Sequence, residues 1–503
     1  MVDLRPDQLA TVRAILQAEL PQCEVWAFGS RAKWTAKDSA DLDLAIIAPK
    51  RLSLAKLGKL REAFESSYLP VKVDVVDINR VSREFRKIIE CQRVVIQKGG
   101  ATGAAQTDRA EWQTLPLEEC VETIIDYRGK TPKKVSAGIP LITAKVVKGG
   151  RIETPDEFIA PENYDGWMRR GIPRSGDVLL TMEAPLGQVA QLDERQVALA
   201  PRLVALRGKA ELLDNSFLKY LLQSGSVQDQ LKSRASGTTV LGIKQSELRK
   251  INLALPPLWE QRAIAKVLGS LDDKIELNRR MNETLEGLAQ SLFKSWFVDA
   301  TQDGLPKGWR EVPLPGAIEV NPSCPLRKGA VAPYLDMANM PTRSARALEA
   351  FDREFGSGMR FMDGDTLVAR ITPCLENGKT CFVDFLGNGK VGWGSTEYIV
   401  LRPKPPLPPE FAYFLARTDE FRAFAISHMT GTSGRQAVPA NCLNNFTVAV
   451  PPPELAEKFG QFALAVFAEM KAHDDESRTL AALRDALMPK LLSGGLRVPL
   501  SNL

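Results

Sequence analysis

Two aspartates separated by one residue, Asp41 and Asp43, are the side chains of this sequence whose type and spacing first suggest chemistry. They begin a predicted strand, and because side chains alternate along a strand, both carboxylates lie on the same face of it. A third aspartate, Asp74, lies in a later predicted strand over residues 71–77. Carboxylate oxygens are the hard ligands that Mg²⁺ prefers. The three aspartates therefore predict a site for a divalent cation.

A Gly29-Ser30 turn lies about ten residues before these aspartates, at the end of a predicted strand over residues 24–28. This order of strand, Gly-Ser turn, Asp-x-Asp and later aspartate, over about 95 residues, resembles a minimal nucleotidyltransferase domain of the polymerase-β superfamily. The resemblance implies that Asp41 and Asp43 bind Mg²⁺ ions that bridge a nucleoside triphosphate. It also implies that Asp74 completes the metal site or accepts a proton from the attacking hydroxyl.

The same resemblance gives the turn a function, because backbone amides of Gly29 and Ser30 at a helix start would bind phosphates, with Arg31 assisting. Freestanding domains of this kind act as antitoxins that transfer nucleotidyl groups onto a partner toxin. Two alternatives stay open. Asp77 lies three residues after Asp74, on the opposite strand face, and is the rival third carboxylate. The fold can also persist as a docking surface without activity.

The composition limits the other kinds of chemistry. The chain has 503 residues, 44% hydrophobic and 25% charged, which predicts a soluble protein of two to four domains. Two histidines and seven scattered cysteines without a Cys-x-x-Cys pair argue against histidine catalysis, a zinc site and a disulfide framework. No apolar run reaches eighteen residues, so no membrane span is expected. We expect a cytoplasmic protein.

The small, polar segment 99–108 predicts a flexible linker after a first domain over residues 1–98. Beyond it the chain repeats itself at a spacing of about 190–197 residues. Four landmarks recur in the same order: residues 112–117 with 309–314, 176–180 with 364–368, 218–222 with 411–415, and 251–257 with 446–452. A period this long indicates duplicated domains rather than a solenoid. We expect these domains over residues 109–257 and 305–452.

Each repeat ends in a short apolar strand, a proline pair and a long amphipathic helix, predicted over residues 258–298 and 453–495. Apolar residues at alternating steps of four and three are typical of a coiled-coil seam. Asn278 and His473 fall in the two seams, where a polar residue fixes the register of paired helices. We therefore expect an antiparallel helix pair that holds the two domains apart.

Several segments of this region resemble the specificity subunit of type I restriction-modification enzymes. They are residues 127–134, 138–145, 255–265 and 487–495, and the resemblance extends over about 400 residues. It implies a non-catalytic subunit whose two target-recognition domains each read one half of a split double-stranded DNA site. The paired helices would set the gap and dock adenine methyltransferase subunits, and motor-nuclease subunits would join to cleave DNA. The methyl donor S-adenosylmethionine would be held by the partner.

The fold class that follows is α/β and α+β multidomain. A small nucleotidyltransferase domain precedes two α/β target-recognition domains, which two long antiparallel coiled-coil helices join. The repeats carry no glycine-rich nucleotide fingerprint and no Asn-Pro-Pro-Tyr methyltransferase signature, so we expect no cofactor in the specificity region. Mg²⁺ and a nucleoside triphosphate are expected only in the first domain.

Local clusters, rather than the net charge of +5, point to DNA. Phosphate contacts need Lys, Arg and small polar donors, and base edges need planar side chains such as Arg and Asn. Residues 126–151 carry seven basic residues against one acidic residue, and glycines in the loops 236–245 and 430–436 allow close approach to a backbone. The candidate DNA-binding residues are Arg128, Lys130, Lys133, Lys134, Lys145 and Lys244 in the first repeat, and Arg343, Arg346, Arg370, Asn377, Lys379 and Arg435 in the second.

Two functions of different class follow. The first is a DNA-recognition subunit that directs adenine methylation and cleavage by partner subunits. The second is a Mg²⁺-dependent, antitoxin-like nucleotidyltransferase whose C-terminal region is a recruitment module for DNA or a partner. Any chemistry intrinsic to the chain is expected before the linker.

Overall fold

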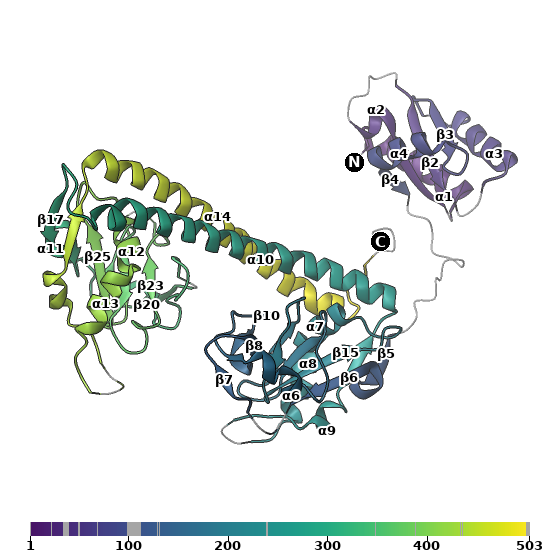
Figure 1. Ribbon diagram of the computed structural model, residues 1–503. Coiled ribbons are helices and arrows are strands. Elements are labelled where there is room, and N and C mark those ends of the chain that lie inside the picture. The colour runs from purple at the N-terminus through teal and green to yellow at the C-terminus, as the bar shows by residue number, and fades with distance from the viewer. Residues whose placement is uncertain are drawn as a thin grey trace. The chain divides into compact units, whose positions relative to one another are not determined.

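The computed structural model describes residues 2–21, 23–33, 40–48, 51–67, 69–97, 112–127, 129, 131–237, 240–347, 349–387, 389–432, 434 and 436–498. The chain divides into two compact units, Met1–Glu111 and Trp112–Leu503, which are described separately (Figure 1). The predicted linker over residues 99–108 lies outside the described residues. No described helix is long and apolar enough to cross a membrane.

The first unit is a four-stranded sheet with the order β3-β2-β1-β4, in which only β2 and β3 run parallel. Its elements are α1 (Pro6–Glu19), β1 (Glu24–Phe28), α2 (Gly29–Ala32), β2 (Leu42–Ile47), α3 (Leu54–Glu65), β3 (Val73–Asp77), α4 (Arg83–Gln92) and β4 (Val94–Gln97). Apolar residues of α1 and α3 pack on one face of the sheet, and Ile89 of α4 packs on the other. Ser53 and Ser82 accept hydrogen bonds at the starts of α3 and α4, which caps both helices.

The second unit contains two repeats of the same design. The first has β5 (Gln113–Pro116), α5 (Leu117–Cys120), β6 (Val121–Asp126), β7 (Lys134–Val135), β8 (Ile139–Ile142), β9 (Val147–Lys148), β10 (Arg151–Ile152), β11 (Phe158–Ile159), α6 (Tyr164–Trp167), β12 (Val178–Thr181), β13 (Val189–Gln191), β14 (Ala198–Leu199), β15 (Leu203–Gly208), α7 (Asn215–Gln223), α8 (Gly225–Ser233), α9 (Gln245–Leu248) and β16 (Asn252–Leu255).

The second repeat has β17 (Arg310–Pro313), α11 (Leu314–Ala317), β18 (Ile318–Val320), β19 (Val331–Leu335), β20 (Phe351–Glu354), β21 (Met359–Phe361), β22 (Thr366–Ala369), β23 (Thr380–Phe382), β24 (Gly392–Gly394), β25 (Tyr398–Pro403), α12 (Phe411–Ala416), α13 (Asp419–Ser427) and β26 (Thr447–Val450). Each repeat has two four-stranded sheets; we call the one with more residues in its strands the larger sheet and the other the smaller sheet. The larger sheet of the second repeat has the order β23-β22-β25-β18, which matches β13-β12-β15-β6 in the first repeat strand for strand. The repetition read from the sequence is therefore a duplication of topology in this sheet and in the two-stranded pairs β5-β16 and β17-β26.

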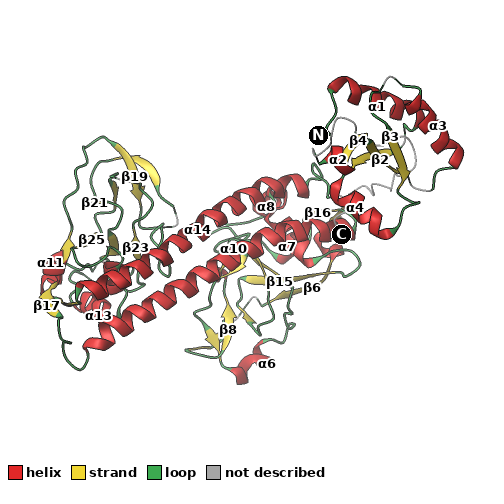
Figure 2. Cartoon of the chain, turned by 90° about the horizontal axis from the view of Figure 1, so that it is seen from above, coloured by secondary structure: helices red, strands yellow, loops and turns green. Residues whose placement is uncertain are grey.

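Two long helices, α10 (Leu258–Phe293) and α14 (Pro453–Leu492), run side by side (Figures 1 and 2). Asn278 donates to the carboxylate of Glu476 at 2.7 Å. Asn282 donates to the carboxylate of Asp474 at 2.9 Å, and its amide oxygen accepts from the His473 ring nitrogen Nδ1 at 2.8 Å. Residue numbers rise along one helix as they fall along the other, so the pair is antiparallel. Both predicted seam residues, Asn278 and His473, are buried in it.

The repeats pack at opposite ends of this pair. The core of the first repeat includes Ile264 and Leu268 near the start of α10, together with Leu491 at the end of α14. The core of the second repeat includes Phe293 at the end of α10 and Phe459 near the start of α14. Each helix therefore contributes to both cores, and the helix length separates the two repeats.

Candidate functional sites

The three candidate carboxylates of the first unit lie at one end of the parallel strand pair. β2 and β3 place Asp43 directly opposite Asp74, and Asp41 precedes β2 by one residue. Lys72 lies among them, with its Nζ atom 3.1 Å from Asp74 Oδ1 and 3.9 Å from Asp41 Oδ2. The sequence did not single out Lys72, because the partners of a lysine cannot be read from its spacing along one strand.

The electrostatics of this cluster show how close the carboxylates lie. Partial burial raises the pKa of Asp43, and the charges of Asp74 and Asp41 raise it further, while Lys72 lowers it. Mutual repulsion of this kind is what a bound cation relieves, and the oxygen donors fit Mg²⁺. Among the described residues, however, no three acidic groups converge on one ion position. The donor chemistry fits a divalent cation, and the Lys72 ammonium competes for the same carboxylates.

The turn at Gly29 packs directly against this cluster. Gly29 has φ +76°, and a Cβ atom added there would lie 2.3 Å from Asp43 Oδ2. Both the backbone conformation and the close approach require glycine. Ser30 follows in α2. The structure therefore brings the predicted phosphate-binding turn and Asp43 into contact, while their roles in binding a nucleotide stay a prediction.

Arg31 is buried, and its guanidinium donates to the backbone oxygens of Ala40 and Asp3, both at 2.9 Å. These bonds hold the segment immediately before Asp41 against the start of the chain. The structure gives Arg31 a positioning function there, and contact with a phosphate stays a prediction.

The rival aspartate, Asp77, has a different environment from Asp74. Its carboxylate is buried and accepts backbone hydrogen bonds from Leu52 at 2.8 Å and from Asn79 at 2.9 Å. Asp77 therefore stabilises the segment between β2 and α3 and the turn after β3, whereas Asp74 is exposed beside Asp43. The geometry favours Asp74 as the third carboxylate.

The first repeat contains a cleft of about 710 Å³ that collects several predicted DNA-binding residues. Lys134, Lys145 and Lys244 line it, together with Arg202, which the sequence analysis did not single out. Lys133, which directly precedes Lys134 in the chain, is exposed. Arg128 and Lys130 lie outside the described residues.

Most of these cations are already paired with acidic residues. Lys134 and Lys145 contact Glu157 at 2.7 and 3.0 Å, and Arg202 contacts Glu183 at 3.1 Å. The hydrogen bond from Lys134 lowers the pKa of Glu157, which keeps that acid ionised. A phosphate in this cleft would therefore exchange one partner of the lysines for another, so the cluster contributes less attraction than its basic residues alone suggest.

Some candidate DNA-binding residues of the second repeat are exposed, and others already contact groups of the chain itself. Arg343 and Asn377 are exposed. Arg370 lies 3.6 Å from Glu397, and Lys379 donates to the backbone oxygen of Met337. Arg435 lies outside the described residues. Contact with DNA stays a prediction for each of them.

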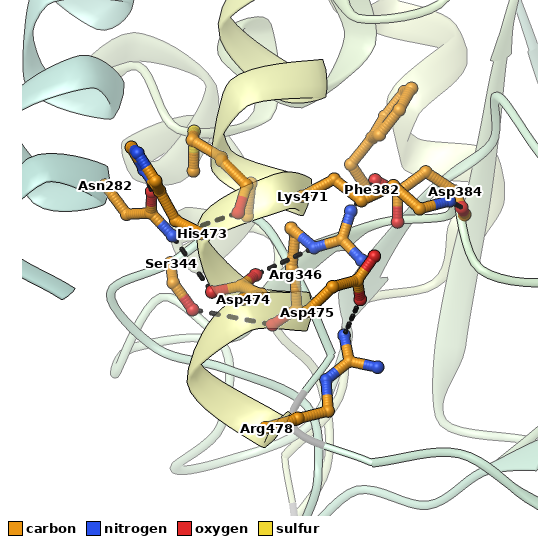
Figure 3. Close-up of polar contacts among 12 residues, drawn as sticks. Asn282, Ser344, Arg346, Phe382, Asp384, Lys471, His473, Asp474, Asp475 and Arg478 are labelled. Carbon is orange, nitrogen blue, oxygen red and sulfur yellow. Dashed lines mark hydrogen bonds and ion pairs between the residues drawn. The ribbon is translucent and has the colours of Figure 1, made fainter. Parts of the chain in front are cut away.

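Arg346 requires a correction, because it is buried between the second repeat and α14 (Figure 3). Its guanidinium pairs with Asp384 of the repeat and, at 2.8 Å, with Asp474 of the helix. Burial raises the pKa of both aspartates and Arg346 lowers it. A guanidinium enclosed by two carboxylates at an internal interface cannot contact DNA in this structure. Its function is to bind the second repeat to the helix pair.

Comparison with known proteins finds relatives for both units. Residues 110–287 match the family described as the type I restriction modification DNA specificity domain, and residues 12–99 match that described as polymerase beta, nucleotidyltransferase. The probable protein adenylyltransferase MntA of Haemophilus influenzae is 46% identical over 97 residues, which cover 19% of this chain and 85% of the relative.

The type I restriction enzyme MjaIX specificity subunit of Methanocaldococcus jannaschii is 25% identical over 358 residues, which cover 64% of this chain and 78% of the relative. Among solved structures, the S subunit of a type I restriction-modification system from M. genitalium aligns with a TM-score of 0.47 and 14% identity. That alignment covers 77% of this chain and 98% of the other.

Proposed function

Because this chain belongs to the MntA family through its first unit and carries the specificity region of a type I restriction-modification enzyme in its second, we propose that it is a DNA-recognition subunit with an appended nucleotidyltransferase. The second unit reads a bipartite double-stranded DNA site. It directs adenine methylation, and cleavage of unmodified DNA, by partner subunits that supply the catalysis.

The observation that carries this proposal is the placement of two copies of one domain at opposite ends of an antiparallel helix pair. Such a pair relates its ends by an approximate twofold rotation, so the two domains can face two halves of one site. At 1.5 Å per residue, the 36 residues of α10 span about 54 Å. At 3.4 Å per base pair that length corresponds to roughly 16 base pairs, which allows a gap between the half-sites.

The exposed face of α10 supports the proposal of protein partners. Its buried face is polar at the centre, with Asn278, Asn282 and Glu286 inside, while Leu277, Met281 and Leu288 are 51%, 39% and 55% exposed. These exposed apolar side chains are four and seven residues apart, so they form a stripe on one face of the helix. We assign this stripe to the adenine methyltransferase subunits, which hold S-adenosylmethionine. Motor-nuclease subunits then join the methylating complex.

The test of this function is reconstitution with the methyltransferase subunits and mapping of methylated adenines across a genome. We expect one bipartite sequence with a fixed gap, and methylation without sequence preference would contradict the proposal. A variant with Leu277, Met281 and Leu288 all changed to serine should keep DNA binding but lose copurification with the methyltransferase. A matched variant, Arg279→Ser on the same helix, should keep both.

For the first unit we propose a second activity, transfer of a nucleotidyl group from a nucleoside triphosphate to a hydroxyl group of a partner protein. The hydroxyl oxygen forms a bond to the α-phosphorus, the bond between the α- and β-phosphates breaks, and pyrophosphate leaves. The contact of the Gly29 turn with Asp43, beside Asp41 and Asp74, favours it. Asp41 and Asp43 would hold Mg²⁺, which would neutralise charge on the triphosphate. Asp74 either adds a third ligand or accepts the proton of the attacking hydroxyl.

Incubation of the full chain with labelled nucleoside triphosphates and Mg²⁺, with and without candidate partner proteins, tests this activity. The double variant Asp41→Ala/Asp43→Ala should abolish label transfer, while Glu62→Ala on the exposed face of α3 should retain it. Transfer that survives in the double variant would contradict the assignment. Loss of transfer that leaves the methylation pattern unchanged would show that the two units act independently.

A further inference from the structure

The two repeats agree in their larger sheets but differ in their smaller ones. The smaller sheet has the order β14-β8-β11-β7 in the first repeat and β20-β19-β24-β21 in the second. Both contain one parallel pair, Leu141 with Ala198 at the edge of the sheet in the first repeat and Tyr334 with Trp393 at its centre in the second. The pair thus has a different place in the sheet, and the aliphatic pair of the first repeat is an aromatic pair in the second. The smaller sheet is therefore where two otherwise duplicated domains present different chemistry.

In the second repeat this sheet holds an exposed arginine against aromatic rings. Arg353 belongs to β20, whose four residues are all exposed. Its guanidinium carbon lies 4.8 Å from the ring centroid of Tyr334 and 5.7 Å from that of Trp393. The two rings are 4.4 Å apart, and the indole of Trp393 donates to the backbone oxygen of Arg353 at 3.3 Å. Stacking on the rings restricts the orientation of the planar guanidinium.

Arg353 also differs in charge pairing from several of the basic candidates predicted from the sequence. Lys134, Lys145 and Arg346 contact carboxylates, whereas no ion pair of Arg353 occurs among the residues that the structure describes. The first repeat has its lysine-lined cleft on the smaller sheet, since Lys134 begins β7 and Leu141 of β8 is part of the lining. Both repeats thus present cations at this sheet, and Arg353 is positioned by rings and not by acids.

From this geometry we propose that Arg353 is the base-reading side chain of the second repeat and contacts a guanine in the major groove of one half-site. The inference rests on the proposed DNA-recognition function and adds a residue and a base to it. A guanidinium presents two parallel donors that match the O6 and N7 acceptors of guanine. Because the rings already restrict the side chain, less conformational entropy is lost on binding than for a freely rotating lysine or arginine.

The test is the reconstituted complex with its methyltransferase subunits, in which the methylated sequence is mapped for wild type, Arg353→Ala, Arg353→Lys and the control Arg310→Ala. Arg310 is exposed on β17, away from the smaller sheet. We expect Arg353→Ala to lose roughly 5- to 150-fold of the discrimination at a single G·C pair in one half-site. The other half-site should stay unchanged. Arg353→Lys keeps the charge but not the planar pair of donors, so it should lose discrimination at the same pair while keeping more of the overall affinity.

A structural or purely electrostatic role predicts different results. Arg353→Ala that weakens binding equally for all sequences, or changes both halves, would overturn the proposal, as would unchanged discrimination at every position or a change at an A·T pair. A wild-type complex without sequence preference would instead refute the proposed function of the whole second unit. Hydrogen exchange of β19 and β24 in the Arg353 variants separates loss of a contact from loss of the sheet.

Discussion

Replacing Arg346 by methionine removes the cation that lies between two partly buried carboxylates, at the contact between the second repeat and α14. The arginine and Asp384 side chains are 6% and 17% exposed, and that of Asp474 is 35% exposed. Removal of one partner from a buried ion pair costs about 3–5 kcal/mol. Since water reaches Asp474 in part, we expect a loss of about 2–4 kcal/mol in the free energy of opening of this contact at neutral pH.

The loss should depend on pH in a defined direction. Burial already raises the pKa of Asp384 and Asp474, and Arg346 is the largest influence that lowers it. Without the arginine, both values rise further above those of the unfolded chain. The folded variant then binds more protons than its unfolded chain, so its stability increases as the pH falls. The difference between variant and wild type should therefore shrink from pH 7 to pH 5.

Native-state hydrogen exchange of α14 and of the strands of the second repeat measures the free energy of opening. Arg343→Met, an exposed arginine three residues earlier, is the matched control and should change it by less than about 0.5 kcal/mol. Neutralising the carboxylates as well, with Asp384→Asn and Asp474→Asn, should recover most of the loss. A change below about 0.5 kcal/mol in Arg346→Met, or a difference that grows on acidification, would refute the account of this contact.

Three further predictions concern other buried contacts. Gly29→Ala should destabilise the first unit by about 1–3 kcal/mol and abolish nucleotidyl transfer, because the added carbon would meet Asp43 Oδ2. In contrast, Gly58→Ala in α3, where a Cβ meets nothing, should stabilise it by about 0.5–1 kcal/mol; both are measured by urea unfolding. Because protons and Mg²⁺ compete for Asp43, whose pKa is raised in the metal-free chain, the affinity for Mg²⁺ should begin to fall, on acidification, at a pH above the ordinary aspartate range, and a calorimetric affinity that stays constant down to that range would contradict this. Tyr220→Phe removes the hydroxyl that donates to Asp272 at 2.7 Å and should cost about 1.5–3 kcal/mol in the second unit, visible as a lower urea midpoint than wild type.

The features that could be predicted from the sequence are those that depend on residues close together, or at regular intervals, along the chain. Alternation placed Asp41 and Asp43 on one strand face, heptad spacing gave the two long helices, and recurring landmarks revealed the duplicated domains. Asn278 and His473 were recognisable as seam residues because a polar side chain interrupts an otherwise apolar period. These patterns are local or periodic, so their physical meaning does not require the fold.

Only the tertiary structure decided which charged groups meet. Arg343 and Arg346 lie three residues apart, and nothing in the sequence distinguishes them. In the structure, however, Arg346 is enclosed by Asp384 and Asp474, two residues that are distant from it in the chain. The pairing of Lys134 with Glu157 and the stacking of Arg353 on Tyr334 and Trp393 likewise join separate segments. A charge can bind a ligand only if the fold has not already given it a partner. Periodicity therefore located the candidate surfaces, while long-range contacts determined which side chains on them remain available.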